Sequence, residues 1–356
     1  MNSNSMQEKI ITTEANKVVV LSAPASGKTA TVVNRIKYLL NSGENPKEIV
    51  AITFTNNAAS EMLERLGNPE NLFIGTVHSY CNYLLLKAGI NTRKVLDAND
   101  FDKLFEIIKK HLEAIDHIKY LIVDEAQDSD ESQFEFFLNV LKPENWMLIG
   151  DLRQSIYGFN GACPEKLIEL SKRKDVTTYK MNTNYRNGRK ILDYARSIIY
   201  PLGSDYYDES IPARQVNGKV VRECLPISEI PFLIRDYGAK SYKDWFVLCR
   251  SNLQVEQICR ALKKEEIPYD TFKQADLDYK ELKKRNQDNT VKVLTAHSAK
   301  GLEAKNVIVY GITPWSDEER RLAYVASTRA ENLLIWITAP RRKRRKRKTQ
   351  NVSNWE

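Results

Sequence analysis

The residues with the clearest chemical use lie in a short loop near the N-terminus. After a β-branched run, the chain reads SAPASGKT over residues 22–29, and a segment with helical spacing follows. Backbone N–H groups at a helix start can face a β-phosphate, a lysine can reach the β- and γ-phosphates, and a hydroxyl can hold Mg²⁺. Lys28 and Thr29 supply those groups, although Ser22 replaces the usual first glycine. The loop predicts a nucleotide site, with an ordinary strand-to-helix turn as the alternative. The residues expected at the nucleotide here are Ala25, Ser26, Gly27, Lys28, Thr29 and Ala30.

A second segment suited to chemistry is acidic. The apolar run from Tyr120 to Val123 ends in DEAQD over residues 124–128. Two adjacent acids at the carboxyl end of a strand are what an ATPase requires: Asp124 would hold Mg²⁺ through water, and Glu125 would act as general base towards the attacking water. For the segment alone, a solvated turn is the alternative. Together with the phosphate loop it predicts ATP and Mg²⁺ as cofactors, with Thr29 and Asp124 at the metal.

The elements that must position these residues follow a regular alternation. Short β-branched runs bounded by turn residues alternate with longer segments of helical spacing, such as 29–40. The predicted strands are 18–21, 49–54, 72–76, 120–123 and 146–149, then a strand near 220, and 245–249, 291–295, 307–310 and 333–338. Such alternation predicts parallel sheets covered by helices on both sides. Because the pattern restarts after about residue 181, we expect an α/β fold with two cores in tandem.

Composition narrows the class of protein. With 356 residues, 42% of them hydrophobic, the chain can form two packed cores. A formal net charge of +8 is compatible with a polyanionic partner. The five cysteines are scattered without the C-x-x-C spacing of zinc or redox sites, so buried, reduced thiols are expected. No stretch approaches the roughly 20 apolar residues of a bilayer span, so we expect a soluble cytoplasmic protein without membrane partners.

The motifs, taken in order, resemble those of superfamily 1 DNA helicases of the UvrD/Rep (PcrA-like) family. The DEAQD segment resembles the family's D-E-x-Q-D box, and GDLRQSIYGFNGA at 150–162 is similar to its sensor segment. The other matching segments are TFTN at 53–56, GTVHS at 75–79, NYR at 184–186, TAHSAKGLE at 295–303 and ERRLAYVASTRA at 319–330. The resemblance covers about residues 6–338. It implies two tandem RecA-like P-loop NTPase domains with ATP in the cleft between them.

The resemblance assigns nucleotide roles to residues of both cores. Arg186 and Arg329 resemble the family's γ-phosphate arginines, which stabilise charge on the transferring phosphoryl group. Gln154 is similar to its γ-phosphate sensor. For either arginine alone, a surface salt bridge is the alternative. The resemblance also implies that Tyr185 stacks on adenine, that Gln7 hydrogen-bonds the adenine edge and that Glu303 lies near the ribose.

The resemblance also implies a nucleic-acid track across both cores. Single strands are held by stacked aromatic rings and by polar or cationic groups along the phosphates. The residues expected to form the track are Thr53, Phe54, Thr55, Asn56, Thr76, His78, Tyr157, Phe159 and His297, and Tyr80 is a further aromatic of these segments. We place most weight on Phe159, and core packing is the alternative for each aromatic. The predicted partner is single-stranded DNA, either alone or at single-strand/duplex junctions.

The motifs divide the chain into three parts. We expect a first RecA-like domain over 1–181 with a small helical insertion near 79–117, a second over 182–340, and a basic tail over 341–356. The tail's eight consecutive cations at 341–348 would bind DNA or RNA without sequence preference, with a nuclear-targeting sequence as the alternative in a eukaryotic host. Both large insertions of the family look missing, and a short charged segment, 273–289, stands in place of the second. The chain therefore resembles a compact form of the family.

The predicted function is an ATP-dependent helicase or translocase on single-stranded DNA. By resemblance alone it would travel 3′ to 5′, in a prokaryotic or phage-infected cell, with protein partners in repair, recombination or replication. Hydrolysis and translocation need only the two cores, whereas the family's insertions contact duplex and regulate unwinding. The alternative from another class is an ATP-switched nucleic-acid-binding subunit of a larger nuclease, repair or replication complex. A small-molecule P-loop kinase would not need the second core's arginine motifs.

Overall fold

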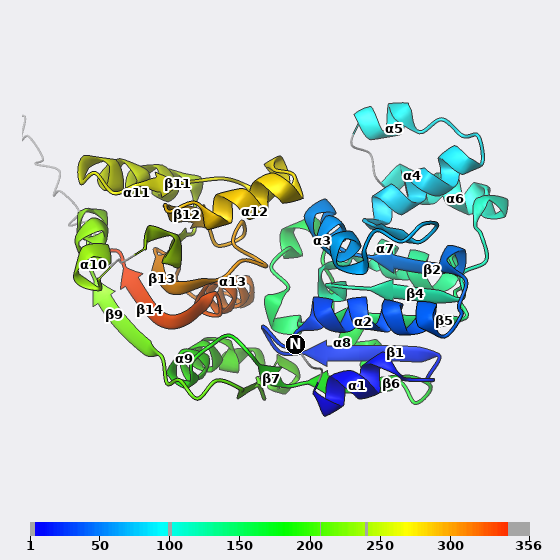
Figure 1. The fold of residues 1–356 in the computed structure, drawn as a ribbon, viewed down its shortest axis with the longest axis horizontal. Coiled ribbons are helices and arrows are strands. Elements are labelled where there is room, and N and C mark those ends of the chain that lie inside the picture. The colour runs from blue at the N-terminus through cyan, green and yellow to red at the C-terminus, as the bar shows by residue number, and fades with distance from the viewer. Residues whose placement is uncertain (1–3, 99–101, 207, 239–240, 341–356) are drawn as a thin grey trace, which may run out of the picture.

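Two six-stranded parallel sheets organise the computed structural model, which describes residues 4–98, 102–206, 208–238 and 241–340 (Figure 1). The first sheet has the order β3-β2-β4-β5-β1-β6. Its strands are β1 (Lys17–Ser22), β2 (Ile49–Ile52), β3 (Phe73–Gly75), β4 (Tyr120–Val123), β5 (Asn145–Gly150) and β6 (Thr177–Met181). The second has the order β11-β12-β10-β13-β14-β9. Its strands are β9 (Lys219–Cys224), β10 (Trp245–Cys249), β11 (Tyr269–Asp270), β12 (Val291–Thr295), β13 (Ala304–Tyr310) and β14 (Ala330–Thr338). Between the sheets, β7 (Thr183–Asn184) pairs with β8 (Ile211–Pro212).

Helices cover both faces of the first sheet because its strands are apolar on both sides. Along β1, Val18 and Val20 share a buried cluster with Ile36, whereas Val19 shares the opposite cluster with Leu84. The helices of the first cluster are α1 (Ser5–Ile11), α2 (Lys28–Asn41) and α3 (Asn56–Leu66). Those of the opposite cluster are α4 (Val77–Lys87), α5 (Arg93–Asp97), α6 (Asp102–Lys110), α7 (Glu131–Glu135) and α8 (Pro164–Ser171). We call this sheet and its helices the first lobe.

The second lobe repeats this three-layer arrangement. Trp245 and Val247 of β10 face α10 (Ile230–Asp236) and α11 (Asn252–Lys264). Phe246 and Leu248 face the other layer, which contains α9 (Arg189–Ile199), α12 (Tyr279–Gln287) and α13 (Asp317–Ser327). Ile156, from the segment after β5 of the first lobe, is fully buried in this second-lobe cluster. The two lobes therefore share packed side chains at their junction.

The predicted α/β class with two parallel sheets is confirmed. The predicted runs 49–54 and 72–76 are longer than the strands, because Thr55 and Thr76 already cap helices: their hydroxyls accept from the backbone N–H groups of Ala58 and Ser79. β6 and β11 were not predicted. Among the described residues, no helix has the length and apolar character needed to cross a membrane.

The five cysteines are free, and the prediction that they are buried holds for three of them. Cys81, Cys249 and Cys259 are buried, but Cys163 is half-buried and Cys224 is exposed, so the prediction was wrong for these two. Cys224 is the last residue of β9, an edge strand of the second sheet, which explains its exposure.

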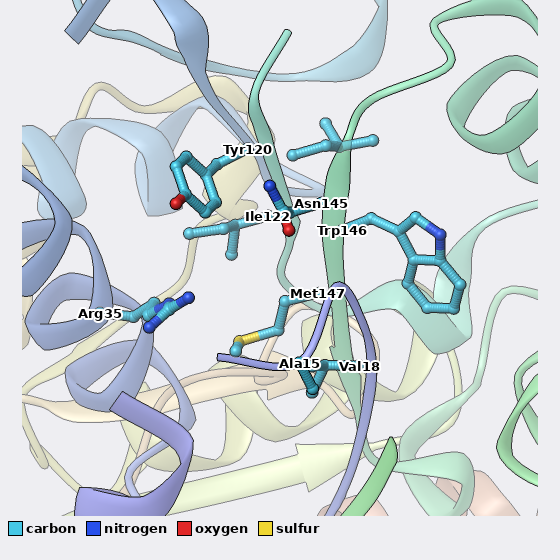
Figure 2. A pocket seen from close by; sticks show the side chains of 9 residues that line it. Ala15, Val18, Arg35, Tyr120, Ile122, Asn145, Trp146 and Met147 are labelled. Atoms are coloured by element: carbon cyan, nitrogen blue, oxygen red, sulfur yellow. The ribbon is translucent and has the colours of Figure 1, made fainter. Parts of the chain in front are cut away.

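A small cavity of about 10 Å³ lies at the amino-terminal edge of the first sheet (Figure 2). Arg35 of α2 and Tyr120, at the start of β4, are among its lining residues. The Arg35 guanidinium donates to the Ile11 carbonyl (2.8 Å) and lies 5.9 Å from the Tyr120 ring centroid. Burial lowers the pKa of Arg35. A space this small holds about one water molecule, so this buried arginine ties α2 to the end of α1 and does not mark a ligand site.

Candidate nucleotide and nucleic-acid site

Three segments predicted to handle the nucleotide leave neighbouring strands of the first sheet. The phosphate loop follows β1, the acidic segment follows β4, and the sensor segment follows β5; in the sheet, β5 lies between β4 and β1. Because all three strands are parallel, their carboxyl ends meet at one edge. This edge is where open α/β sheets bind ligands.

The phosphate loop has the backbone that its sequence predicts. Gly27 caps α2 in the left-handed region with φ +83°, and a Cβ there would lie 2.8 Å from Nε2 of Gln7. Glycine is therefore required on both counts. Ser26 is buried, and its hydroxyl has no hydrogen-bond partner among the described residues. A buried unpaired hydroxyl beside free N–H groups of a helix start suits a bound phosphate.

Lys28 and the two acids face one another across this edge. The Lys28 ammonium lies 3.8 Å from Oε1 of Glu125, and the Thr29 hydroxyl lies 3.4 Å from Oδ2 of Asp124. A hydroxyl and a carboxylate at this spacing form an oxygen donor set of the kind that Mg²⁺ prefers. Gln127 donates to Oε2 of Glu125 (2.5 Å), and Glu125 has a left-handed backbone with φ 54°. Such backbone strain is a feature of functional sites.

The two acids have opposite electrostatic environments. Burial and the charge of Glu125 raise the pKa of Asp124. Burial acts in the same direction on Glu125, but Lys28 and Lys300 outweigh it and lower the pKa of Glu125. Glu125 is thus held as a carboxylate, and a divalent cation at Asp124 would favour the ionised form there too.

Arg329 joins the second lobe to the sensor of the first. Its guanidinium is 2% exposed and donates to Oε1 of Gln154 (3.1 Å), while Nε2 of Gln154 donates to Asp151 (2.8 Å). Burial and the nearby Arg186 lower the pKa of Arg329 to about 9. Arg186 instead pairs with Glu303, 2.5 Å from Nε to Oε2, within the second lobe. The structure therefore places Arg329 in contact with the predicted sensor of the first lobe. Arg186 lies beside Arg329 but pairs with Glu303, the residue predicted near the ribose.

Gln7 and Tyr185, which are far apart in the sequence, both contact the phosphate loop. Nε2 of Gln7 donates to the Ser26 carbonyl (2.9 Å), and its Oε1 accepts from the Asn4 backbone (2.9 Å). The Tyr185 hydroxyl accepts from the Asn4 amide (2.8 Å), and its backbone N–H donates to the Ala25 carbonyl (3.1 Å). Both residues thus lie next to the loop, where the predicted adenine contacts would form.

Lys300 lies in this seam although it was not among the predicted site residues. It comes from the loop after β12, and its ammonium pairs with the Asp128 carboxylate of the first lobe. It also donates to the Gln154 carbonyl (3.0 Å) and lies 3.8 Å from Oε2 of Glu125 and 5.1 Å from the centre of the Tyr157 ring. Burial opposes its charge, but Asp128 and Glu125 outweigh burial and raise the pKa of Lys300. The only available signal was its position inside the segment 295–303.

Four predicted track residues form a cluster of rings from both lobes. Phe54 and Tyr157 are stacked with centroids 4.7 Å apart, and Phe159 lies 6.0 Å from Tyr157 and 5.8 Å from His297 of the second lobe. Phe159 is 64% exposed, so its ring is available to a ligand. Burial, followed by two nearby cations, lowers the pKa of His297 to about 4, which leaves it neutral at pH 7.

Three of the remaining predicted track residues, Thr53, Thr76 and His78, line a cavity in the first lobe. This cavity, of about 220 Å³, is lined by twelve residues that include Thr53, Phe54, Thr76, His78, Asp124 and Glu125. Thr53 is 2% exposed, and its hydroxyl has no hydrogen-bond partner among the described residues. The cavity therefore extends from the acids to the predicted track. Thr55 and Asn56, at the start of α3, are exposed.

The interpretation of Tyr80 as a residue of the predicted track is wrong. It is 2% exposed, its ring packs 4.7 Å from Phe73, and it belongs to the core of the first lobe. Tyr80 is one turn of α4 beyond the capping Thr76 and faces the sheet, so core packing was the right interpretation. The basic run at 341–348 lies outside the described residues.

The fold and the seam define the class of protein: a P-loop NTPase with two RecA-like lobes and an arginine reaching across the nucleotide edge. Comparison with protein families makes this specific. Residues 3–116 and 112–175 match the UvrD/REP helicase N-terminal domain, and residues 270–341 match the UvrD-like helicase C-terminal domain. The chain belongs to the UvrD/REP helicase family.

Similar curated proteins include three from bacteria. A probable DNA helicase of Mycoplasma pneumoniae is 25% identical over 454 aligned positions, which cover 94% of this chain and 83% of that protein. The ATP-dependent DNA helicase Rep of Buchnera aphidicola is 27% identical over 76% of this chain and 57% of its own length. The ATP-dependent DNA helicase PcrA of Staphylococcus aureus is 24% identical over 75% and 50%. The chain thus matches about half the length of PcrA.

Proposed function

We propose that this chain is an ATP-dependent DNA helicase or translocase that hydrolyses ATP in the seam between its lobes and moves along single-stranded DNA. The observation that carries the proposal is the contact between Arg329 and Gln154. It connects the second lobe to the sensor of the lobe that contains Lys28 and Glu125. Lobe closure and hydrolysis are therefore coupled through one buried guanidinium.

At the nucleotide, each residue has a role that its position supports. Lys28 and the loop 25–30 bind the phosphates, Thr29 and Asp124 hold Mg²⁺, and Glu125 accepts a proton from the attacking water. When bound, Mg²⁺ neutralises charge on the phosphate oxygens. The residues that sense or stabilise the γ-phosphate are Gln154, Arg186 and Arg329, and those at the base and ribose are Gln7, Tyr185 and Glu303. Arg186 must exchange its partner Glu303 for phosphate to act in this way.

The track for single-stranded DNA runs over the ring cluster and the segments beside it. Its proposed residues are Thr53, Phe54, Thr55, Asn56, Thr76, His78, Tyr157, Phe159 and His297. Rings supplied by both lobes, such as Phe159 and His297, would let relative lobe movement shift a stacked strand. We propose 3′ to 5′ travel from the family resemblance, and a cytoplasmic location in a prokaryotic or phage-infected cell because the relatives are bacterial.

The domain division is part of the proposal. Both sheets are complete on either side of the connecting segment 182–218. This supports a first domain over 1–181, with the helices α4 to α6 as its small insertion, and a second over 182–340. Residues 341–356 would form the basic tail, and deletion of 341–348 should weaken DNA binding and flatten its salt dependence.

The test is ATP hydrolysis measured with and without single-stranded DNA. DNA should stimulate the wild-type chain, and Lys28→Ala or Glu125→Gln should abolish the stimulated rate. Lys37→Ala, on the exposed side of α2, is the matched control and should behave as wild type. Near-native turnover in either site variant would overturn the site assignment. ATP binding without DNA stimulation would favour the alternative, an ATP-switched binding subunit. Duplexes with 3′ or 5′ tails then test unwinding and polarity.

A further inference from the structure

Gln274, in the short segment 273–289 of the second lobe, lies at the boundary between the two lobes. It forms a 3₁₀ turn, Gln274–Asp276, followed by α12, and Leu282 of α12 is buried in the second-lobe core. From the first lobe, the Asn57 amide on α3 donates to the Gln274 carbonyl (2.9 Å). The Gln274 amide in turn donates to two carbonyls of the loop after β12, those of Ser298 (2.6 Å) and Lys300 (2.8 Å). Gln274 is thus bonded on one side to α3 and on the other to this loop.

Both ends of this bridge carry residues of the proposed machinery. Asn57 immediately follows Asn56 in the first turn of α3, beside the track segment 53–56. The loop after β12 carries His297 in the ring cluster and Lys300 in the seam. Its own internal contacts are short-range turns, such as the Ser298 N–H to the Thr295 hydroxyl (3.2 Å). These turns shape the loop, and its direct contacts with the first lobe include those of the Lys300 ammonium with Asp128 and with the Gln154 carbonyl.

We infer that Gln274 is a positioning residue that sets the spacing between the DNA-contacting segments of the two lobes. The inference rests on the proposed function and deepens it, because it names the group that holds the two halves of the track in register. A side-chain amide is suited to this role: its two N–H groups diverge in one plane and fix two carbonyls at once. The bridge leaves the nucleotide residues themselves untouched.

A second contact between α12 and α3 has a different character. Lys283 pairs with Glu64 (3.0 Å), and both side chains are more than half exposed. Lys283 and Tyr279 hydrogen-bond to Glu64 and lower its pKa. Exposed ion pairs contribute little to stability and are screened by salt. The half-buried bonds of Gln274 therefore determine the spacing more than this pair does.

The test uses Gln274→Met, which preserves side-chain length, adds no charge and removes both donors. Gln287→Met is the matched control, since Gln287 is an exposed glutamine at the end of α12, in the same segment. Hydrolysis is measured against single-stranded DNA concentration. Because a hydrogen bond is worth a factor of a few in an equilibrium, we expect Gln274→Met to raise the half-saturating DNA concentration about threefold to tenfold. The DNA-free rate and the KM for ATP should remain unchanged.

A second variant tests whether the bridge acts as one unit. Asn57→Ala breaks the same bridge at its other end, so the two breaks act in series. The double variant should therefore be no worse than the stronger single variant. Effects that multiply would overturn the inference, as would a half-saturating concentration in Gln274→Met equal to that of the control. A DNA-free rate reduced as strongly as the stimulated rate would show a merely structural role. If the wild-type chain itself shows no DNA stimulation, the proposed function fails instead.

Discussion

The ion pair between Lys300 and Asp128 joins the two lobes, and its removal should be measurable as a loss of stability. The Asp128 side chain is fully buried in the first lobe, and the Lys300 side chain, from the second, is 10% exposed. Lys300→Met keeps an unbranched side chain but removes the charge. Asp128 then remains buried without its cation, and Oδ1 of the same carboxylate has no hydrogen-bond partner among the described residues.

The magnitude follows from the burial of both partners. Removing one member of a buried ion pair costs about 3–5 kcal/mol, whereas removing both leaves no unpaired charge. We expect Lys300→Met and Asp128→Asn each to lower the free energy of unfolding by about 3 kcal/mol. The double variant should lose less unfolding free energy than the two single variants added together, with a coupling energy of at least about 2 kcal/mol. Burial raises the pKa of Asp128 to about 7 despite the opposing effect of Lys300, so the carboxylate of the wild-type chain is ionised at pH 8.

The assay is urea unfolding of the four proteins at pH 8, followed by tryptophan fluorescence. Lys305 and Asp244 provide a control pair: their N···O distance is 3.1 Å, but the Lys305 side chain is 55% exposed. Lys305→Met and Asp244→Asn should show a coupling of less than about 1 kcal/mol. If Lys300→Met and Asp128→Asn are additive within about 0.5 kcal/mol, the reasoning is refuted.

Three further predictions concern other contacts. Arg329→Ala should lower the kcat of DNA-stimulated hydrolysis by about 10³-fold or more with a smaller change in KM, and a normal kcat in steady-state kinetics would contradict its γ-phosphate role. Phe159→Ala should raise the Kd for single-stranded DNA by about tenfold or more in fluorescence titrations, whereas Tyr200→Ala, equally exposed, should not. Tyr324→Phe removes a hydroxyl that donates to Asp208 (2.7 Å), so thermal melts at pH 7 should show about 1.5–3 kcal/mol lost. A nearby arginine and hydrogen bonds outweigh burial and lower the pKa of Asp208. Its stabilisation is therefore present above about pH 4 and lost as pH falls further, so the variant's deficit should shrink in acid.

Strands with apolar runs could be predicted from sequence, whereas a largely polar edge strand and a two-residue edge strand could not. Tyr120–Val123 and Trp245–Cys249 are apolar runs because helices cover both sides of their sheets, and both were predicted to the residue. Thr177–Met181 pairs with β1 on one side only, and most of its residues are exposed or half-buried. Its side chains are largely polar, so no apolar run marks it. Tyr269–Asp270 is too short to show any pattern.

In the site, local sequence predicted the loops but not the contacts between lobes. The phosphate loop depends on nearby residues, since glycine is needed where the backbone is left-handed. Lys300 and its partner Asp128 are 172 residues apart, and only the packing of the lobes brings them together. Tyr80 illustrates the same limit of local sequence. The neighbouring motif placed Tyr80 near the track, but Tyr80 lies on the buried face of α4.

The contacts between the proposed hydrolysis site and the proposed track form a continuous series. Phe54 stacks on Tyr157, the Lys300 ammonium lies beside the Tyr157 ring and binds the Gln154 carbonyl, and the Gln154 side chain holds Arg329. Each link is a direct contact, and all but the first cross the lobe boundary. A strand that displaces Tyr157 must therefore disturb the surroundings of Lys300, and lobe closure that moves Arg329 must disturb Gln154. Coupling through such a series requires each contact to have an alternative state. Lys300 has one available, because Glu125 lies within 3.8 Å and competes with Asp128 for the same ammonium.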